Sequence, residues 1–372
     1  MSANSLDYIT VRGFKSIASI EKLPLKSVNV LIGSNGSGKS NFIGVFSFLH
    51  AIREGRLRDY VIQAGGAERI LHFGSKTTQQ INILLSFGDE VNQYEITLSP
   101  TQDDGLYPSS ETTFFWDKSR YKRPWDEPLA PREQGREAGI SYPQVKKTPS
   151  WVRGRLGGWR LYHMHDTSIT SPMRKTAKVD DNQFLKPDGS NLAAFLYYLQ
   201  EKRQTSYSLI RRTIQQVAPF FDDFRLEPSR LKPDDIKLEW RHKGSDQYFD
   251  SGSFSDGTLR FIALATLFLQ PQEMFPSVIL VDEPELGLHP FAIEMLAALI
   301  RQAAQSTQVI VSTQSSLLLD HFDPGDVLVA NREGGGTIIE RLEPHRLKDW
   351  LEDYSLGQLW EKNEFAGRPN SK

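Results

Sequence analysis

Eight consecutive residues near the N-terminus have the types and spacing of a phosphate-binding loop. They match G-x-x-x-x-G-K-[ST] and are Gly33, Ser34, Asn35, Gly36, Ser37, Gly38, Lys39 and Ser40. In such a loop the backbone N–H groups surround the phosphates of a nucleotide. The Lys39 ammonium is expected to reach the β- and γ-phosphates, and the Ser40 hydroxyl is expected to ligate Mg²⁺.

The segments on either side of this loop fit the same interpretation. Residues 28–32 are apolar and β-branched, which predicts a buried strand. After the loop, apolar residues recur at helical spacing from Phe42 to Leu49, so a helix is expected to begin near Lys39. The loop therefore lies at a helix N-terminus, where unpaired N–H groups and the helix dipole favour an anion.

A second motif lies far along the chain, where the apolar run 278–281 ends in Asp282 and Glu283. This pattern is typical of a central parallel strand with carboxylates at its C-terminal edge, where open α/β sheets bind ligands. Asp282 is expected to hold Mg²⁺, and Glu283 to polarise the attacking water. Two acids before Pro284 are also typical of a helix cap, but the phosphate-binding loop requires an acidic partner of this kind.

A third motif is the small-residue loop 253–258, which precedes an almost wholly apolar segment, 259–269. That segment is shorter than the roughly 20 residues needed to span a bilayer, so a buried helix is expected. Its N-terminus is a second potential phosphate site. If it serves the nucleotide of another copy, the protein is a head-to-tail pair. A capped core helix with no ligand is an equally good interpretation.

The order of these motifs resembles that of the OLD-like and RecF-like ABC ATPases, which have SMC-type heads. Residues 9–17 are similar to the first strand of those heads, and the loop continues into Asn41 as it commonly does there. Ser255, Asp256 and Gly257 are similar to the ABC signature. Residues 282–290 look like the Walker B and D-loop pair, and Gln314 stands at the switch position.

The resemblance implies an α/β fold: an ABC-type P-loop NTPase head with a mainly parallel central sheet, an antiparallel β-subdomain and an inserted basic, aromatic segment. It also implies ATP and Mg²⁺ as cofactors. Glu283, Gln314 and Lys39 would be catalytic. The P-loop, with Asn41, and the signature would bind nucleotide across a homodimer, and Ser40 and Asp282 would hold the metal.

Three departures from the family pattern stand out. The second signature position is Asp256 instead of glycine, and the switch position is Gln314 instead of histidine. A glutamine can donate a hydrogen bond but cannot change charge near neutral pH. No Q-loop glutamine is clear. Gln63 is a candidate, although an exposed loop residue is the better interpretation of it.

The composition is that of a soluble, cytoplasmic enzyme. The chain has 372 residues, 39% of them hydrophobic, a net charge of −2 and no cysteine, so disulfides and thiol chemistry are excluded. We see no signal peptide and no apolar run long enough to cross a membrane. No heptad repeat is sustained, so the coiled-coil arms of SMC proteins are absent, and too little chain follows the switch for a Toprim nuclease domain.

Five segments are expected along the chain. They are the N-terminal part of the head (1–100), an insertion (101–185), a helical and strand lobe (186–250), the C-terminal part of the head (251–345), and a C-terminal helix and tail (346–372). Hairpins are expected at 81–98 and around 334–336, an amphipathic helix at 191–217, and a loose end beyond Pro369.

The insertion is locally basic, with 14 Lys and Arg against 6 Asp and Glu between residues 117 and 178. Within it, aromatic and arginine side chains are interspersed, at Trp151, Arg153, Arg155, Trp159 and Arg160. Such a mixture is suited to phosphate contacts and base stacking. A surface for a partner protein or a merely solvated insertion would have the same composition. Binding of DNA is therefore one of three open interpretations.

His163, His165 and Asp166 form a weak metal pattern. Alternation along a strand would put the two imidazoles on one face. Three ligands without a distant fourth are few for zinc, so core or surface histidines are the favoured interpretation.

The expected function is a Mg²⁺-dependent ATP-sandwich homodimer that acts as a switch. It would control a separately encoded effector, a nuclease or toxin, in bacterial antiviral defence. The main alternative is a solitary RecF-like DNA-binding ATPase in repair. A transporter subunit is disfavoured because the motifs resemble the RecF branch and no membrane partner is indicated. A scaffold that binds ATP without hydrolysing it would fit the Asp256 and Gln314 departures.

Overall fold

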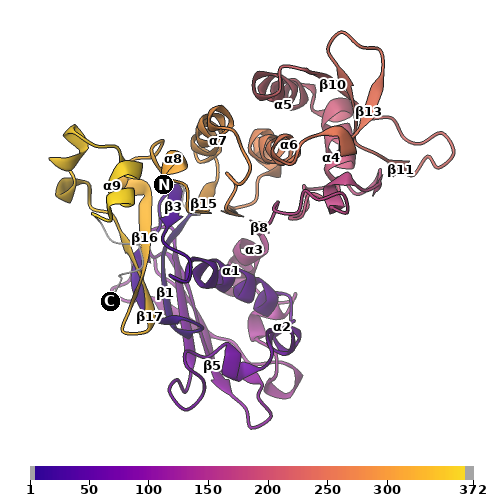
Figure 1. Cartoon of the computed structure of the whole chain (residues 1–372). Coiled ribbons are helices and arrows are strands. Elements are labelled where there is room, and N and C mark those ends of the chain that lie inside the picture. The colour runs from indigo at the N-terminus through magenta and orange to yellow at the C-terminus, as the bar shows by residue number, and fades with distance from the viewer. Residues whose placement is uncertain (1–4, 365–372) are drawn as a thin grey trace. The chain divides into compact units, whose positions relative to one another are not determined.

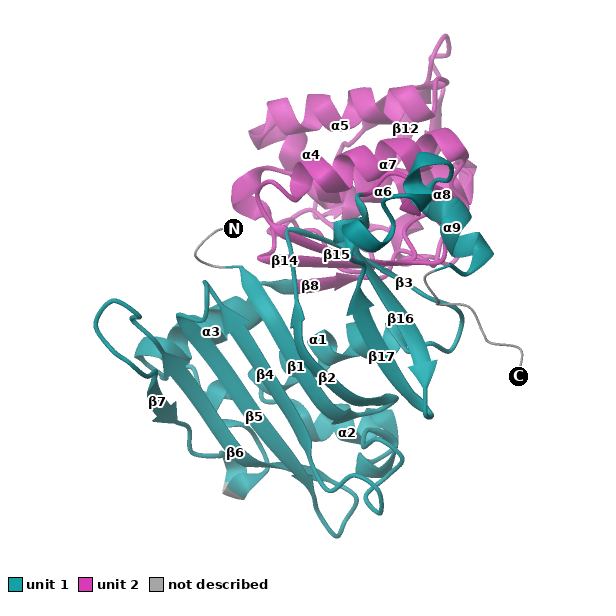
Figure 2. Ribbon diagram, turned by 90° about the vertical axis from the view of Figure 1, so that its left-hand side faces the viewer, with its two compact units in different colours: residues 1–159, 323–372 teal, residues 160–322 magenta. Residues whose placement is uncertain are grey.

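The computed structural model of the chain describes residues 5–364 and divides into two compact units. Unit 1 comprises residues 1–159 and 323–372, and unit 2 comprises residues 160–322. Figure 2 colours the two units separately. Each unit is described here by itself.

Unit 1 is built around a six-stranded sheet in the order β2-β1-β4-β5-β6-β7. All neighbouring strands in it are antiparallel. Their bounds are β1 (Leu6–Phe14), β2 (Ile17–Pro24), β4 (Ile81–Phe87), β5 (Asn92–Pro100), β6 (Leu106–Phe115) and β7 (Trp125–Pro128). In β5 the buried side chains are Tyr94, Ile96 and Leu98, every second residue, as expected when one face of a strand is covered.

Helices cover one face of this sheet, as Figures 1 and 2 show. They are α1 (Lys39–Arg53), α2 (Leu57–Ala64) and α3 (Lys147–Gly157). Helix α1 buries a row of aromatic and aliphatic side chains that includes Phe42, Phe46 and Leu49. This row is the helical periodicity seen in the sequence.

The same unit contains a second group of strands that carries the phosphate-binding loop. Strand β3 (Val28–Ile32) pairs in parallel with β16 (Val327–Glu333), which pairs antiparallel with β17 (Gly336–Arg341). All five residues of β3 are buried, as its continuous apolar run predicts. Helix α9 (Leu356–Lys362) follows near the C-terminus and begins with a capping box at Ser355.

Unit 2 combines a parallel strand pair with helices and small antiparallel sheets. Strand β14 (Val278–Asp282) pairs in parallel with β15 (Gln308–Thr313), and β8 (Trp159–Tyr162) is the other neighbour of β14. The small sheets have the orders β10-β12-β13 and β11-β9. Their strands are β9 (Ala177–Lys178), β10 (Phe221–Arg225), β11 (Asp235–Ile236), β12 (Glu239–His242) and β13 (Tyr248–Asp250).

The helices of unit 2 are α4 (Leu192–Lys202), α5 (Gln204–Val217), α6 (Asp256–Leu269), α7 (Pro290–Ala303) and α8 (Ser316–Leu319). Every residue of α6 from Leu259 to Leu269 is buried, because α5 and α7 both pack against it. The prediction of a buried helix at 259–269 is confirmed.

Most local predictions are confirmed and a few need correction. The hairpins β4–β5 and β16–β17 occur where expected, the second turning through Gly334 and Gly335 at positive φ. The single helix expected at 191–217 is two helices, because the chain leaves helical geometry at Arg203, where φ is −140°. The strand expected at 9–17 is β1, and Lys15 turns the chain into β2.

The two compact units divide the chain into fewer parts than the five expected segments. The chain passes from one compact unit to the other at 159/160 and at 322/323. The segments bounded at 100, 185, 250 and 345 stay a prediction. The first part of the expected insertion extends the antiparallel sheet as β6 and β7, so it is less irregular than its composition suggests. The expected C-terminal helix is α9, and the tail beyond Pro369 lies outside the described residues.

Candidate functional site

The phosphate-binding loop of unit 1 connects β3 to α1 and depends on glycine at three positions. Gly36 and Gly38 have φ of 80° and 102°, in the left-handed region that other residues rarely adopt. A Cβ on Gly33 would lie 2.5 Å from the Ala330 carbonyl oxygen of β16, and one on Gly38 would overlap Thr337 of β17. The neighbouring strands therefore leave room for backbone only, and the loop places its N–H groups at the start of α1.

Lys39 and Ser40 occupy the first turn of α1. The Lys39 side chain is 6% exposed, and its Nζ donates to the carbonyl oxygens of Gly33 (2.6 Å) and Ser34 (3.2 Å). The ammonium group thus lies inside the curve of the loop, where a phosphate would be surrounded. Ser40 is exposed and offers a hydroxyl oxygen of the kind that Mg²⁺ takes as a ligand.

Three side chains, from Ser16, Asn41 and Thr337, support the loop on the side away from the phosphate position. Thr337 Oγ1 donates to the Ser37 carbonyl oxygen (2.9 Å) and shares a hydrogen bond with Ser16 Oγ (2.7 Å). Asn41 Nδ2 donates to the same Ser16 hydroxyl (2.6 Å). Asn41 was expected to bind nucleotide, but in this structure its amide supports the loop. Thr337 follows the glycine turn by one residue, and no motif marks it.

A hollow of about 650 Å³ lies beside these residues in unit 1. Lys15, Ser16, Asn41 and Phe73 are among the side chains that line it. The Phe73 ring is exposed, and burial lowers the pKa of the Lys15 ammonium. An aromatic face and a cation beside a phosphate loop are suited to a nucleoside and its charged groups.

In unit 2 the acidic pair stands at the carboxyl end of β14. Glu283 adopts a φ of +41°, a strained conformation for a non-glycine residue, and its N–H donates to the Ser312 carbonyl of β15 (2.7 Å). The Gln314 side-chain amide donates to Glu283 Oε1. The structure therefore brings together the expected base and the expected switch residue, although 31 positions separate them.

A further carboxyl group lies behind this pair. Glu285 is 7% exposed and accepts hydrogen bonds from Thr313 Oγ1 (2.6 Å) and from the backbone N–H of Gln314 (3.3 Å). Burial raises the pKa of Glu285, and the nearby Glu283 carboxylate acts in the same direction. Glu285 thus fixes the backbone that carries Gln314. In the sequence, Glu285 is marked only as part of the Walker B-like run.

The signature-like loop begins α6. Ser255 caps the helix by accepting from the backbone N–H of Thr258 (3.2 Å), and it is exposed. Asp256, the departure from glycine, forms an ion pair with Arg174 Nη2 (3.2 Å). The Arg174 guanidinium neutralises a charge that would otherwise repel a phosphate.

Glycine at the third signature position has a steric cause. A Cβ on Gly257 would overlap the carbonyl oxygen of Gly287, in the loop that follows β14. The two loops are therefore in backbone contact, which accounts for the signature glycine independently of any ligand.

The two histidines after β8 come together with Asp282 and not with Asp166, the acid that the sequence pattern indicated. Ligand atoms of His163, His165 and Asp282 all lie within 4.8 Å of one another. The expected acid, Asp166, instead accepts from the Ser168 hydroxyl (2.6 Å) and is exposed. Neither histidine is in a strand, because β8 ends at Tyr162. Burial lowers the pKa of His163, while the Asp282 carboxylate opposes that shift.

The basic, aromatic surface is only partly present. Trp159 is 3% exposed and packs on Phe46 of α1, with ring centroids 5.1 Å apart, so the prediction that it lies on a binding surface is wrong. Trp151 packs on Phe87, and the Arg155 guanidinium lies over the Trp151 ring at 5.0 Å. These rings serve packing within unit 1.

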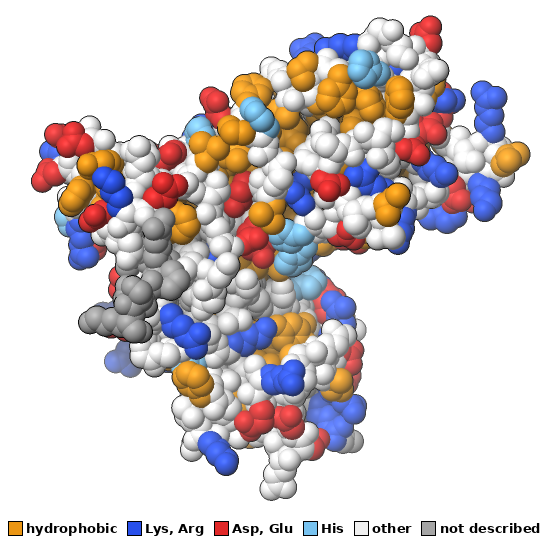
Figure 3. All heavy atoms as spheres, viewed as in Figure 1, with side chains coloured by type: hydrophobic (Ala, Val, Ile, Leu, Met, Phe, Trp, Pro, Cys, Tyr) orange, Lys and Arg blue, Asp and Glu red, His pale blue; other side chains and the backbone are white. Residues whose placement is uncertain are grey.

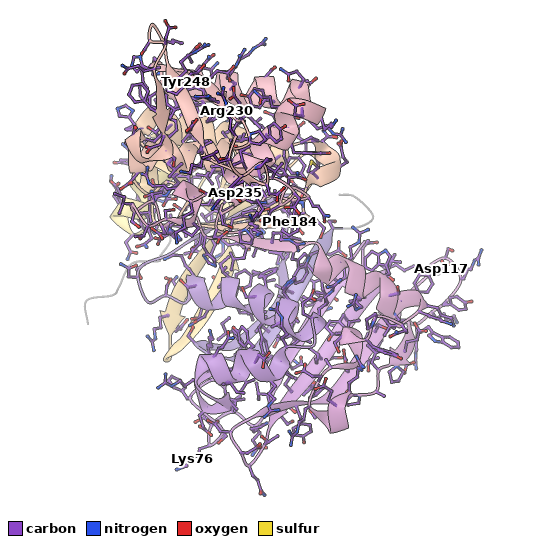
Figure 4. All side chains as sticks on the ribbon, turned by 90° about the vertical axis from the view of Figure 1, so that its right-hand side faces the viewer. Lys76, Asp117, Phe184, Arg230, Asp235 and Tyr248 are labelled. Atoms are coloured by element: carbon purple, nitrogen blue, oxygen red, sulfur yellow. The ribbon has the colours of Figure 1, made fainter. Side chains whose placement is uncertain are left out.

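The arginines of this set are partly buried. Burial lowers the pKa of both Arg153 and Arg155. Arg160, in unit 2, lies 5.1 Å above the ring of Phe184, which Figure 4 labels. On the face of each unit that Figure 3 shows, Lys and Arg side chains are interspersed with acidic ones. Gln63, the Q-loop candidate, is exposed on α2.

Comparison with known structures supports the fold. The chain is similar to an SMC head bound to the C-terminal winged-helix domain of ScpA, with 17% identity, a TM-score of 0.58 and coverage of 93% of this chain and 99% of the other. It is also similar to an SMC head with an extended coiled coil bound to the C-terminal domain of ScpA from Pyrococcus furiosus. There the identity is 14%, the TM-score 0.57 and the coverage 94% and 99%. The predicted ABC-type α/β head with its antiparallel subdomain is confirmed.

No curated protein matches the sequence. Within residues 5–364, no helix has both the length and the apolar character needed to cross a membrane. A protein-family match covers residues 28–320, from β3 to the residues after α8, and so includes the P-loop, the signature, the acidic pair and Gln314. This P-loop ATPase domain of the SMC-head type therefore belongs to the family described as "AAA domain, putative AbiEii toxin, Type IV TA system".

Proposed function

We propose that this protein hydrolyses ATP with a divalent metal ion and uses the cycle as a molecular switch. The observation that carries the proposal is the contact between the Gln314 amide and the Glu283 carboxylate at the end of β14. A P-loop alone accounts for nucleotide binding. A carboxylate held by a side-chain amide at this strand end accounts for hydrolysis, because it can accept a proton from an attacking water while the amide orients that water.

Each remaining residue has a role that follows from its chemistry. The P-loop N–H groups and the Lys39 ammonium would neutralise charge on the β- and γ-phosphates. Ser40 and Asp282 provide oxygen ligands for Mg²⁺. The bound ion would supply further positive charge between the phosphates. The φ of +41° at Glu283 supports a functional role, since such strain is retained where it positions a side chain.

We further propose that ATP joins two copies of the chain. The P-loop of one copy and the signature residues Ser255, Asp256 and Gly257 of the other would enclose one nucleotide. Ser255 is exposed at the N-terminus of α6, a helix end suited to an anion, and Arg174 offsets the charge of Asp256. Binding of ATP would close the pair, and hydrolysis would open it.

The switch would control a separately encoded effector, a toxin or nuclease, in bacterial antiviral defence. The description of the family, which refers to a toxin and a type IV toxin–antitoxin system, supports this proposal. A solitary DNA-binding ATPase is less well supported, because Trp159 is buried and Trp151 packs on Phe87.

Glu283→Gln tests the hydrolytic role. This variant keeps the shape of the side chain but removes the carboxylate, so ATP binding should persist, phosphate release should fall by at least about a hundredfold, and the ATP-bound dimer should accumulate. Glu294→Gln, an exposed residue of α7, is the matched control and should leave all three unchanged. Hydrolysis that survives Glu283→Gln would contradict the assignment. Lys39→Ala should lose ATP binding itself.

A pull-down with the Glu283→Gln protein addresses the effector. Tagged protein purified from its native host with ATP should retain the effector in stoichiometric amount, and mass spectrometry identifies it. Recovery of DNA with no protein partner would favour the solitary repair ATPase instead.

A further inference from the structure

The segment that follows β8 presents two imidazole rings beside the acid at the end of β14. His163 and His165 have ring centroids 6.2 Å apart, and their nitrogens lie within 4.8 Å of each other and of an Asp282 oxygen. Within residues 5–364 neither ring forms a hydrogen bond to another side chain or to the backbone. The two rings are therefore available to a ligand that lies against the Asp282 carboxylate.

The backbone that carries these rings is held at three points. The His163 N–H donates to the Pro187 carbonyl oxygen (3.0 Å). Arg260 of α6 donates from Nε to the Met164 carbonyl oxygen (2.9 Å) and from Nη2 to the His165 carbonyl oxygen (2.8 Å). A fixed backbone lowers the entropy lost when the rings bind an ion.

The same arginine ties this segment to the loop after β14. The Arg260 side chain is buried, and its Nη1 donates to the Leu286 carbonyl oxygen. Three carbonyl acceptors around one guanidinium connect the histidine segment, the signature helix and the acidic strand end within unit 2. Arg260 is thus a positioning residue, since it acts through the backbone and not through its own contact with an ion.

We propose that His163, His165 and Asp282 bind a first-row transition-metal cation, such as Mn²⁺ or Co²⁺. Two neutral imidazoles and one carboxylate form a donor set of two nitrogens and one oxygen. Imidazole suits transition metals, whereas Mg²⁺ and Ca²⁺ prefer oxygen ligands alone. Bonds of about 2.1 Å put ligand atoms about 3–3.5 Å apart, so the three groups would close in from their present spacing when the ion binds, and open positions remain for water or a phosphate oxygen.

This site deepens the proposed function, because Asp282 is the acid expected to hold the metal of the nucleotide. The inference that this ion is the metal of the nucleotide site rests on the proposed function. The inference that the three side chains bind a cation is independent of the proposed function, since it requires no nucleotide. The histidines would give the nucleotide site a preference for transition metals over Mg²⁺.

Cobalt binding to the full-length, tag-free protein without nucleotide tests the site directly. Equilibrium dialysis should show one Co²⁺ per chain, and the absorption of the bound ion should report nitrogen ligands. In the double variant His163→Gln and His165→Gln, affinity should fall by at least about tenfold, because loss of even an outer partner costs ten- to a hundredfold. The matched control is His345→Gln, an exposed histidine of unit 1, which should bind as the wild type does.

A measurement on the wild-type chain keeps the proposal testable if the double variant does not fold. Pulsed EPR of the Mn²⁺-loaded protein should show coupling to imidazole nitrogen. Three results would each overturn the proposal. They are the absence of this nitrogen coupling, a failure of the wild type to bind Co²⁺ at millimolar concentration, and undiminished Co²⁺ binding by a folded double variant. Wild-type protein that hydrolyses ATP with Mg²⁺ but binds no Co²⁺ would refute the metal site alone. Protein that binds Co²⁺ and never releases phosphate would refute the proposed ATPase function alone.

Discussion

One buried hydroxyl group, that of Thr337, hydrogen-bonds the backbone of the P-loop, and removal of this hydroxyl should weaken ATP binding. Thr337 is 1% exposed, and its Oγ1 makes two hydrogen bonds, to the Ser37 carbonyl oxygen (2.9 Å) and with Ser16 Oγ (2.7 Å). Thr337→Val keeps the shape of the side chain and removes both. Each buried hydrogen bond contributes about 0.5–1.5 kcal/mol, so we expect a loss of about 1–3 kcal/mol.

The effect on ATP follows from where these bonds lie. If the whole loss falls on the loop conformation that surrounds phosphate, ATP affinity drops by about five- to 150-fold, since 1.4 kcal/mol is a factor of ten. Isothermal titration calorimetry with ATP measures the affinity, and urea denaturation measures the stability. Thr337→Ser, which restores the hydroxyl, should recover most of the affinity.

Thr77→Val is the matched control, because Thr77 is an exposed threonine of the same unit. It should change neither quantity. If Thr337→Val binds ATP as tightly as the wild type and is equally stable, the loop keeps its shape without this brace, and the reasoning from the two hydrogen bonds is refuted.

Three further predictions concern unit 2. Glu285→Gln should raise the melting temperature more at pH 8 than at pH 5. The pKa of Glu285 is raised on folding, so its buried charge destabilises the wild type above that pKa, and this destabilisation disappears as the pH falls. A difference in melting temperature that stays the same at both pH values in calorimetric scans would contradict this. Gly257→Ala should lower the melting temperature because its Cβ would overlap the Gly287 carbonyl oxygen, and an unchanged value would show that the two loops can separate. Arg174→Met should also lower it, because the buried guanidinium holds two carbonyl oxygens of the loop before α6 and the Asp256 carboxylate. Equal stability in urea would show that those contacts contribute nothing.

Local chemistry made the candidate nucleotide site predictable in parts. The glycine pattern predicted the loop, the apolar run predicted β3, and the helical spacing predicted α1, because each signal depends on residues within about fifteen positions. The acidic pair at the end of β14 was predictable for the same reason. The family resemblance placed Gln314 at the switch position, and the structure added its contact with Glu283. These predictions required no knowledge of distant contacts.

Errors arose where a residue's environment depends on segments remote in the chain. Trp159 looked like part of a surface because arginines surround it in sequence, yet Phe46 of α1 covers its ring. The helix expected at 191–217 has no glycine or proline to mark its break at Arg203, so its periodicity continued through the break. Burial and packing decide both, and neither follows from composition.

The sequence by itself determined the family, the order of the motifs and the residues that could contact phosphate, because these depend on residue type and short spacing. Only the tertiary structure decided which side chains meet. It replaced Asp166 with Asp282 as the acid beside His163 and His165, and it placed Thr337 behind the P-loop. The physical reason is that neighbouring strands bring together residues that are more than a hundred positions apart, and no local pattern records which strands become neighbours.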